Sequence, residues 1–178
     1  GKVIAFEPCG PSFEILKQNV QRARLSNVVL ERKAVGDQNG CITLYISPSR
    51  AGNTLISGKY HEYCQVEITT LDDYFNDNVT LDLVKIDVEG TEPAVLRGMQ
   101  SLLARRKVKA LILEFYPTLL RDWGTPETPL ELLKNLLNDF NVYHIEPQGK
   151  LRQIASHEVK DFVISVPKWT NLCAIIRK

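Results

Sequence analysis

Short apolar segments alternate along this chain with segments in which apolar residues recur every three or four positions, and this alternation limits the possible folds most. Residues 109–115 form a nearly continuous apolar run, which is typical of a strand buried on both faces. Residues 92–103 instead carry the apolar stripe of an amphipathic helix. Strands that alternate with helices predict an α/β sandwich built around a mostly parallel sheet.

The same patterns place the expected elements along the chain. We expect strands at residues 3–7, 28–35, 41–46, 66–69, 82–88, 109–115, 142–145 and 172–176. Helices should begin near residues 11, 91 and 128, with a helical turn at 71–75. Thr128, Pro129 and Glu131 form a capping box with proline at the first helical position. Residues 149–168 show no pattern that assigns them to an element.

Composition and charge exclude several classes of protein. The chain has 178 residues, 44% of them apolar, which predicts a single domain over residues 1–178. With 22 basic and 21 acidic residues, it lacks the positive excess of a broad nucleic-acid surface. No apolar run approaches the roughly 20 residues that a membrane span needs. Its four cysteines are widely spaced without a CxxC pair, as in the reduced thiols of a cytoplasmic protein.

Acidic residues follow three of the expected strands. Glu7 closes the first strand, Asp87 and Glu89 close the strand at 82–88, and Glu114 closes the strand at 109–115. Because ligands of open parallel sheets bind outside the carboxyl ends of the strands, these acids are candidates for a shared site. A strand-end acid also commonly caps the next helix or pairs with a lysine, so no single one of them establishes a site.

A long polar segment lies at residues 47–59 and contains Asn53 and Thr54. Loops of about a dozen residues without their own secondary structure are often binding loops or lids, and disorder is the alternative. We expect this segment to be a candidate cover for the site.

Several stretches together resemble one known family. They are VIAFEP, LKQNV, AVGD, TTLDDYF, LVKIDVEGTEPAVLRGM and LILEFY, of which KIDVEGTE is the most specific. The chain resembles the FkbM-type methyltransferases, which depend on S-adenosylmethionine and have a Rossmann-like three-layer fold. The resemblance covers residues 1–116 clearly and the C-terminal third only by element order. It implies methyl transfer to a hydroxyl group of a carbohydrate or another natural product.

The resemblance also implies roles for individual residues. Glu7 would bind the ribose hydroxyls of the cofactor, with Pro8 beside it. The Ala34–Asp37 stretch would lie near the adenine. Asp87 would face the methionine end of the cofactor and the acceptor, and the acids Glu89, Glu92 and Glu114 would line the acceptor side.

Transfer of a methyl group to an alcohol benefits from a general base within hydrogen-bond reach of the hydroxyl. Asp87 and Glu89 are candidates for this base, and His144, at the end of a later strand, is another. A lone histidine is more often structural. The same acids could instead hold Mg²⁺, which prefers oxygen ligands, but the sequence gives no reason to assign metal ligands.

The family's glycine-rich first motif, on the strand before VIAFEP, has no counterpart in this sequence. We therefore expect a sheet that lacks its first, central strand and binds S-adenosylmethionine weakly or not at all. The other strands could pair directly, or a homodimer could form through exposed strand edges. The alternative to an enzyme is a non-catalytic α/β interaction module, and a nicotinamide-dependent oxidoreductase is less well supported.

Overall fold

The computed structural model describes residues 1–49, 52–58, 60–75, 79–122 and 128–177. The strands are β1 (Val3–Phe6), β2 (Val28–Glu31), β3 (Ala34–Val35), β4 (Gly40–Tyr45), β5 (Tyr63–Thr69), β6 (Val84–Ile86), β7 (Ala110–Phe115), β8 (Phe140–Ile145), β9 (Leu151–Gln153) and β10 (Thr170–Ile176). The helices are α1 (Gly10–Arg22), α2 (Leu71–Tyr74), α3 (Glu92–Arg97), α4 (Gln100–Ala104), α5 (Pro117–Asp122), α6 (Pro129–Asp139), the 3₁₀ turn η1 (Ser156–Glu158) and α7 (Val159–Ser165). No helix within these ranges is long and apolar enough to span a membrane.

The largest sheet has five strands in the order β6-β7-β10-β8-β9. Only β6 and β7 pair in parallel, whereas β10 runs antiparallel to both β7 and β8, and β9 runs antiparallel to β8. The prediction of a mostly parallel sheet is therefore wrong, and the sheets are mixed. The five-residue connection 146–150 between β8 and β9 explains part of this, because so short a loop can join only antiparallel strands.

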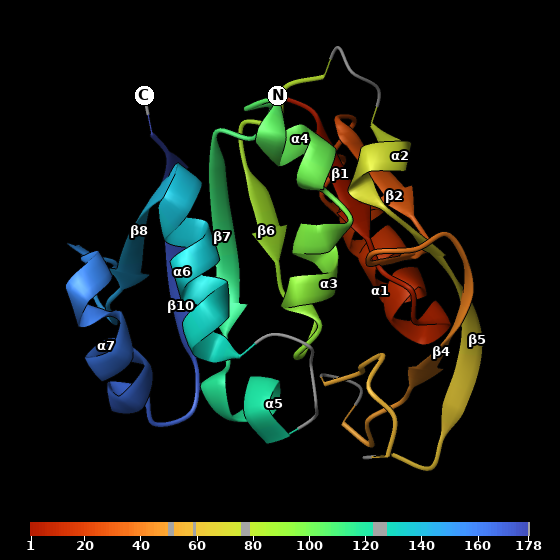
Figure 1. Ribbon diagram of the computed structural model, residues 1–178. Helices are drawn as coiled ribbons and strands as arrows, with labels where there is room; N and C mark the ends of the chain where they lie inside the picture. The colour runs from red at the N-terminus through yellow and green to blue at the C-terminus, as the bar shows by residue number, and fades with distance from the viewer. Residues whose placement is uncertain (50–51, 59, 76–78, 123–127, 178) are drawn as a thin grey trace.

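Two smaller sheets complete the described chain. Strands β1 and β2 form a parallel pair, and β3, β5 and β4 form a three-stranded sheet. The strand expected at residues 28–35 is thus two strands in different sheets, which separate at residues 32 and 33. Strands β1 and β2 lie beyond β6, on the side away from β7, and β1 forms no hydrogen-bonded ladder with β6 in the described structure (Figure 1).

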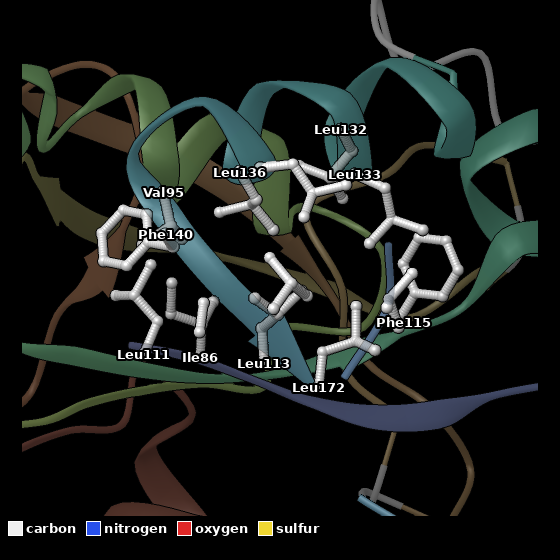
Figure 2. Close-up of a cluster of buried hydrophobic side chains, with 14 of the residues drawn as sticks. Ile86, Val95, Leu111, Leu113, Phe115, Leu132, Leu133, Leu136, Phe140 and Leu172 are labelled. Carbon is white, nitrogen blue, oxygen red and sulfur yellow. The ribbon is translucent and has the colours of Figure 1, made fainter. Parts of the chain in front are cut away.

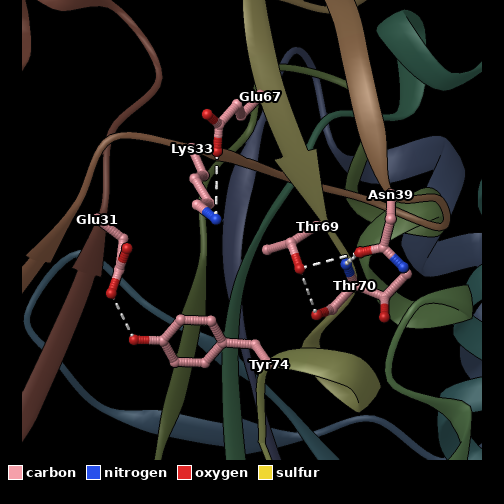
Figure 3. A network of polar contacts seen from close by, with 7 residues as sticks. All are labelled: Glu31, Lys33, Asn39, Glu67, Thr69, Thr70 and Tyr74. Atoms are coloured by element: carbon pink, nitrogen blue, oxygen red, sulfur yellow. Dashed lines mark hydrogen bonds and ion pairs between the residues drawn. The ribbon is translucent and has the colours of Figure 1, made fainter.

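Side chains connect the β1–β2 pair to its neighbours (Figure 3). The Tyr74 hydroxyl on α2 donates to Glu31 Oε1 at the end of β2 over 2.8 Å. Burial, and then the bonded Glu31, raise the pKa of Tyr74 to about 12, so the phenol stays protonated at neutral pH. The Phe6 ring meets Tyr74 edge-on, with 4.9 Å between centroids. These contacts hold the ends of β1 and β2 close to α2, although the β1–β2 pair forms no hydrogen-bonded ladder with the other described sheets.

The main core lies between the five-stranded sheet and helices α3, α4 and α6, which cover one face of it (Figures 1 and 2). Alternate residues of β7, namely Leu111, Leu113 and Phe115, are fully buried on this face. The intervening residues of β7 are only half-buried, since successive side chains of a strand point to opposite faces. Leu132, Leu133 and Leu136 of α6 complete the core from above the sheet. The capping box predicted at Thr128 and Glu131 is confirmed.

The helix predicted from residue 91 is two short helices that meet at Gly98 and Met99. A Cβ atom placed on Gly98 would lie only 1.8 Å from the carbonyl oxygen of Gly36. The chain at this break therefore touches the turn that follows β3, and only glycine permits so close an approach.

Candidate functional site

A cavity of about 260 Å³ lies where the three sheets meet at the carboxyl ends of β1, β3 and β6. Five residues predicted to form the site line it: Glu7, Pro8, Ala34, Asp87 and Glu89. The remaining lining residues are Phe6, Lys33, Val35, Leu44, Asn53, Thr54, Leu55, Val88 and Thr91. The fold thus brings the acids that follow β1 and β6 to one cavity, although these two strands belong to different sheets.

Glu7 occupies the first position after β1. Its backbone N–H continues the β1–β2 ladder by donating to the Glu31 carbonyl over 3.0 Å. The backbone N–H of Cys9 donates to Glu7 Oε1 over 2.8 Å, which fixes the carboxylate at the start of α1. Burial raises the pKa of Glu7, and the Cys9 amide acts in the opposite direction. A fixed, half-buried carboxylate of this kind can accept hydrogen bonds from ligand hydroxyls.

The acids that follow β6 and β7 form a cluster. Ile86 pairs with Leu113 in the parallel register, so Asp87 and Glu114 are the next residues on adjacent strands. The side chains of Asp87, Glu89 and Glu114 each offer an oxygen atom, and these atoms lie within 4.8 Å of one another. Burial raises the pKa of Glu114 to about 7, and the charges of Asp87 and Glu89 act in the same direction. Lys85 contacts Asp87 Oδ2 at 2.6 Å from the exposed side.

The turn that carries Glu89 is held by its own buried acid. Glu89 and Gly90 adopt the left-handed conformation, with φ values of 55° and 100°. Glu92 is only 1% exposed, and its Oε1 accepts the N–H groups of Val88 at 3.3 Å and Gly90 at 3.2 Å. The Thr91 hydroxyl donates to the Val88 carbonyl over 3.1 Å, and the Thr91 side chain does not cap α3. These bonds fix the backbone on both sides of Glu89.

The described part of the 47–59 segment lies against this turn. The Thr54 hydroxyl donates to the Glu89 carbonyl over 3.0 Å, and Thr54 also pairs through its backbone with Tyr45 of β4. Asn53 Oδ1 accepts the Ser47 N–H over 3.0 Å. Residues 50, 51 and 59 of the predicted cover lie outside the described residues. Asn53 and Thr54 therefore line the cavity from a segment that is bonded to the acidic turn.

Four predicted site residues do not line the cavity. Glu114 lies in the acidic cluster beside Asp87 and Glu89, and Glu92 is buried within the turn, where it does not line an acceptor site. The other two lie farther away. Asp37 forms an ion pair with Arg97, with Oδ2 at 2.9 Å from Nη2, and it does not line the cavity. His144 on β8 shares a 2.8 Å hydrogen bond with the Thr170 hydroxyl and meets the Phe162 ring edge-on. Strand β10 lies between His144 and β7, so the structure does not bring this histidine to the acidic cluster.

Lys33 is a cavity residue that sequence reasoning missed. It lies in the two-residue gap between β2 and β3 and forms an ion pair with Glu67 at 3.2 Å (Figure 3). The apolar pattern of residues 28–35 did not reveal the break between β2 and β3. No local feature of the sequence therefore indicated that Lys33 lines the cavity.

Comparison with known proteins assigns the family. The protein-family model of the methyltransferase FkbM domain matches residues 1–154 of this chain. This chain belongs to the FkbM methyltransferase family. The FkbM resemblance found in the sequence is thereby confirmed.

A curated relative and a solved structure show the extent of the likeness. "Methyltransferase 1" of Beauveria bassiana (strain ARSEF 2860) is 26% identical, over 54% of this chain and 48% of that protein. The crystal structure of methyltransferase FkbM from Methylobacillus flagellatus KT superposes with a TM-score of 0.55 at 14% identity, over 97% of this chain and 36% of that one. The FkbM chain described here spans about half the length of the first and about a third of the second.

Proposed function

We propose that this FkbM-family chain forms the core of an S-adenosylmethionine-dependent methyltransferase that methylates a hydroxyl group of a carbohydrate or natural product. The observation that carries the proposal is the cavity that brings Glu7 together with Asp87 and Glu89. The carboxylate that follows β1 would suit a ribose, and the acids that follow β6 would suit a hydroxyl acceptor.

The cavity residues fit part of the cofactor. Glu7 would accept the ribose hydroxyls, Pro8 and Ala34 would contact the adenosine moiety, and Asp87 would face the methionine end. The volume of about 260 Å³ is below the roughly 300–1,000 Å³ of most small-molecule sites. We expect the cofactor to bind weakly to the chain as described.

The acidic cluster supports the chemistry on the acceptor side. The bound cofactor would supply the electrophilic methyl group, and the protein would position the acceptor for in-line attack. Asp87 or Glu89 would accept the hydroxyl proton. Glu114 would bind a further acceptor hydroxyl. His144 keeps its predicted role as a base only if the acceptor extends across β10.

The absence of a ladder between β1 and β6 in the described structure supports the prediction that a central strand is needed between them. The unpaired backbone groups on these two edges would bond to such a strand. Its connection would also complete the cofactor cavity. The same observation favours the second candidate, a non-catalytic α/β module that keeps the family's fold.

Ligand-observed NMR with S-adenosylhomocysteine tests the proposal. We expect saturation transfer to the ribose protons and a Kd weaker than about 0.1 mM. Glu7→Gln should weaken this binding, because hydrogen bonds to a charged carboxylate are stronger than those to a neutral amide. Glu14→Gln on the exposed face of α1 is the matched control and should bind as the parent does.

The outcomes separate the two candidates. Micromolar binding would show that the described residues suffice and that no further strand is needed. No saturation transfer at millimolar ligand would favour the non-catalytic module. An equal loss in Glu14→Gln would show that Glu7 has no specific contact with the ribose.

A further inference from the structure

We propose that the exposed face of strands β4 and β5 binds a neutral oligosaccharide through two tyrosine rings. The proposal rests on the proposed function, because it makes the acceptor a carbohydrate chain that extends from the cavity onto this face. The observations behind it are the pairing of β4 with β5, the exposure of the rings and the charge balance of the face, none of which the proposed function uses.

Strands β4 and β5 present one face to the core and the other to solvent. In their antiparallel register Tyr45 pairs with Tyr63, and Leu44 pairs with Cys64. Leu44 is 2% exposed and Tyr63 is 64% exposed, because successive side chains of a strand point to opposite faces. We call the exposed side the outer face, and β5 lies at the edge of the molecule (Figure 1). The residues of the outer face are Cys41, Thr43, Tyr45, Tyr63, Gln65 and Glu67.

The two tyrosine rings of the outer face offer a surface for stacking. Their centroids are 6.3 Å apart and their planes are inclined at 54°, so the rings do not stack on each other. The face of an aromatic ring carries partial negative charge and attracts the polarised C–H bonds of a sugar ring. Next along the strands, Gln65 Nε2 donates to the Thr43 hydroxyl over 2.9 Å. This amide and hydroxyl can also bond to sugar hydroxyls.

The charge balance of the outer face favours a neutral ligand. Its acid, Glu67, forms an ion pair with Lys33 at 3.2 Å (Figure 3). None of the six outer-face residues is aliphatic. Nucleic acids and anionic membranes are bound by an excess of lysine and arginine, and amphipathic helices are bound by apolar grooves. The outer face therefore suits an uncharged chain rich in hydroxyl groups better than it suits these partners.

The outer face borders the cavity. Tyr45 exchanges two backbone hydrogen bonds with Thr54, of 2.8 and 3.1 Å, and Thr54 lines the cavity. A Cβ atom placed on Gly52 would lie 3.6 Å from the Tyr60 hydroxyl and 3.8 Å from Glu89 Oε2, so a third tyrosine lies near the acidic turn. A sugar bound at this turn would therefore have its neighbouring rings within reach of the tyrosine pair.

Saturation-transfer NMR of the parent chain with maltohexaose and with cellohexaose, without cofactor, tests the proposal. We expect saturation of the ring C–H protons of at least one hexaose, with a Kd of about 1 mM, and weaker binding of the charged hexagalacturonate. Tyr63→Ala should weaken the binding about fivefold or more. Tyr63→Phe keeps the ring and should bind within about twofold of the parent.

Trp169→Ala is the matched control. Trp169 is also an exposed aromatic residue, at 48%, but it precedes β10 in the five-stranded sheet. This variant should bind the hexaose as the parent does. No saturation of either hexaose at about 10 mM, or equal weakening by Trp169→Ala, would overturn the proposal. A dimer of the parent that is lost in Tyr63→Ala would also overturn it, because the outer face would then be a contact between copies.

Binding of S-adenosylhomocysteine separates this proposal from the proposed function. Tyr63 does not line the cavity, so Tyr63→Ala should leave that binding unchanged. A chain that binds the hexaose through Tyr63 but does not bind S-adenosylhomocysteine would support the oligosaccharide site and contradict the methyltransferase proposal. Binding of S-adenosylhomocysteine without hexaose binding would contradict the oligosaccharide site alone.

Discussion

At the scale of single residues, Glu114 is the side chain whose surroundings most alter its chemistry. Its pKa of about 7 in the folded chain lies above the ordinary value of 4.5. The folded state therefore favours the protonated form, and this contribution to stability is complete below about pH 4.5 and lost as the pH rises through 7. Above pH 7 the ionised Glu114 is repelled by Asp87 and Glu89.

Glu114→Gln should therefore stabilise the chain at pH 8 in the presence of a chelator. The side chain is only half-buried, so solvent screening limits the expected gain in unfolding free energy to about 1 kcal/mol. At pH 5 the difference should vanish, because the parent carboxyl is then protonated. Urea denaturation at the two pH values measures it. Glu67→Gln, at an exposed position of β5, should show no such pH-dependent gain.

At the scale of elements, Thr54 connects the β4 side of the cavity to the acidic turn. The residue is 2% exposed, and its hydroxyl donates to the Glu89 carbonyl over 3.0 Å. Thr54→Val keeps the shape of the side chain but leaves this carbonyl without its donor. We expect a loss of about 1–2 kcal/mol in the free energy of unfolding, together with faster amide hydrogen exchange at residues 88–90.

Thr43→Val is the control for this substitution. The Thr43 hydroxyl accepts a bond from Gln65 Nε2 at the exposed surface, so its loss should cost less than about 0.5 kcal/mol. Urea denaturation and hydrogen exchange followed by mass spectrometry measure both variants. Equal costs for the two, or unchanged exchange at residues 88–90, would show that Thr54 does not stabilise the turn.

The sequence allowed most elements to be predicted where a local signal exists. The capping box at Thr128 fixes the start of α6, and the apolar run fixes β7. The direction of β10 could not be predicted, because apolar periodicity is the same for parallel and antiparallel strands. Helix α7 and strand β9 fall within residues 149–168, where no periodicity stands out.

Part of the site could be predicted because some of its residues also have a local signal in the sequence. Acids at strand ends follow from chain order, which placed Glu7, Asp87 and Glu89 at the cavity. The bond between Thr54 and Glu89 joins residues 35 positions apart in the chain, and no local pattern encodes it. Asp37 was placed near the adenine by resemblance, but its ion pair with Arg97 depends on how α3 packs against the turn after β3.

At the scale of the whole molecule, the described fold has unpaired strand edges next to exposed apolar side chains. Strands β1 and β6 each lie at the edge of their sheets. Val3 on β1 is 50% exposed, and Leu83, which precedes β6, is 54% exposed. Two-stranded sheets are marginally stable in water, so the β1–β2 pair gains from further strand pairing. The net charge of +1 provides little repulsion between copies.

In the chain as described, where no central strand pairs with β1 or β6, we therefore expect a homodimer that pairs through these edges. Sedimentation velocity over a concentration series measures it. The double substitution Val3→Lys and Leu83→Lys should shift the chain to monomers, since lysine at a strand edge opposes edge-to-edge pairing. Ile164→Lys is the control, because Ile164 is 73% exposed on α7 and lies away from both edges. It should leave the dimer unchanged. A parent chain that sediments as a monomer at all concentrations, or a dimer lost equally in Ile164→Lys, would contradict pairing through β1 and β6.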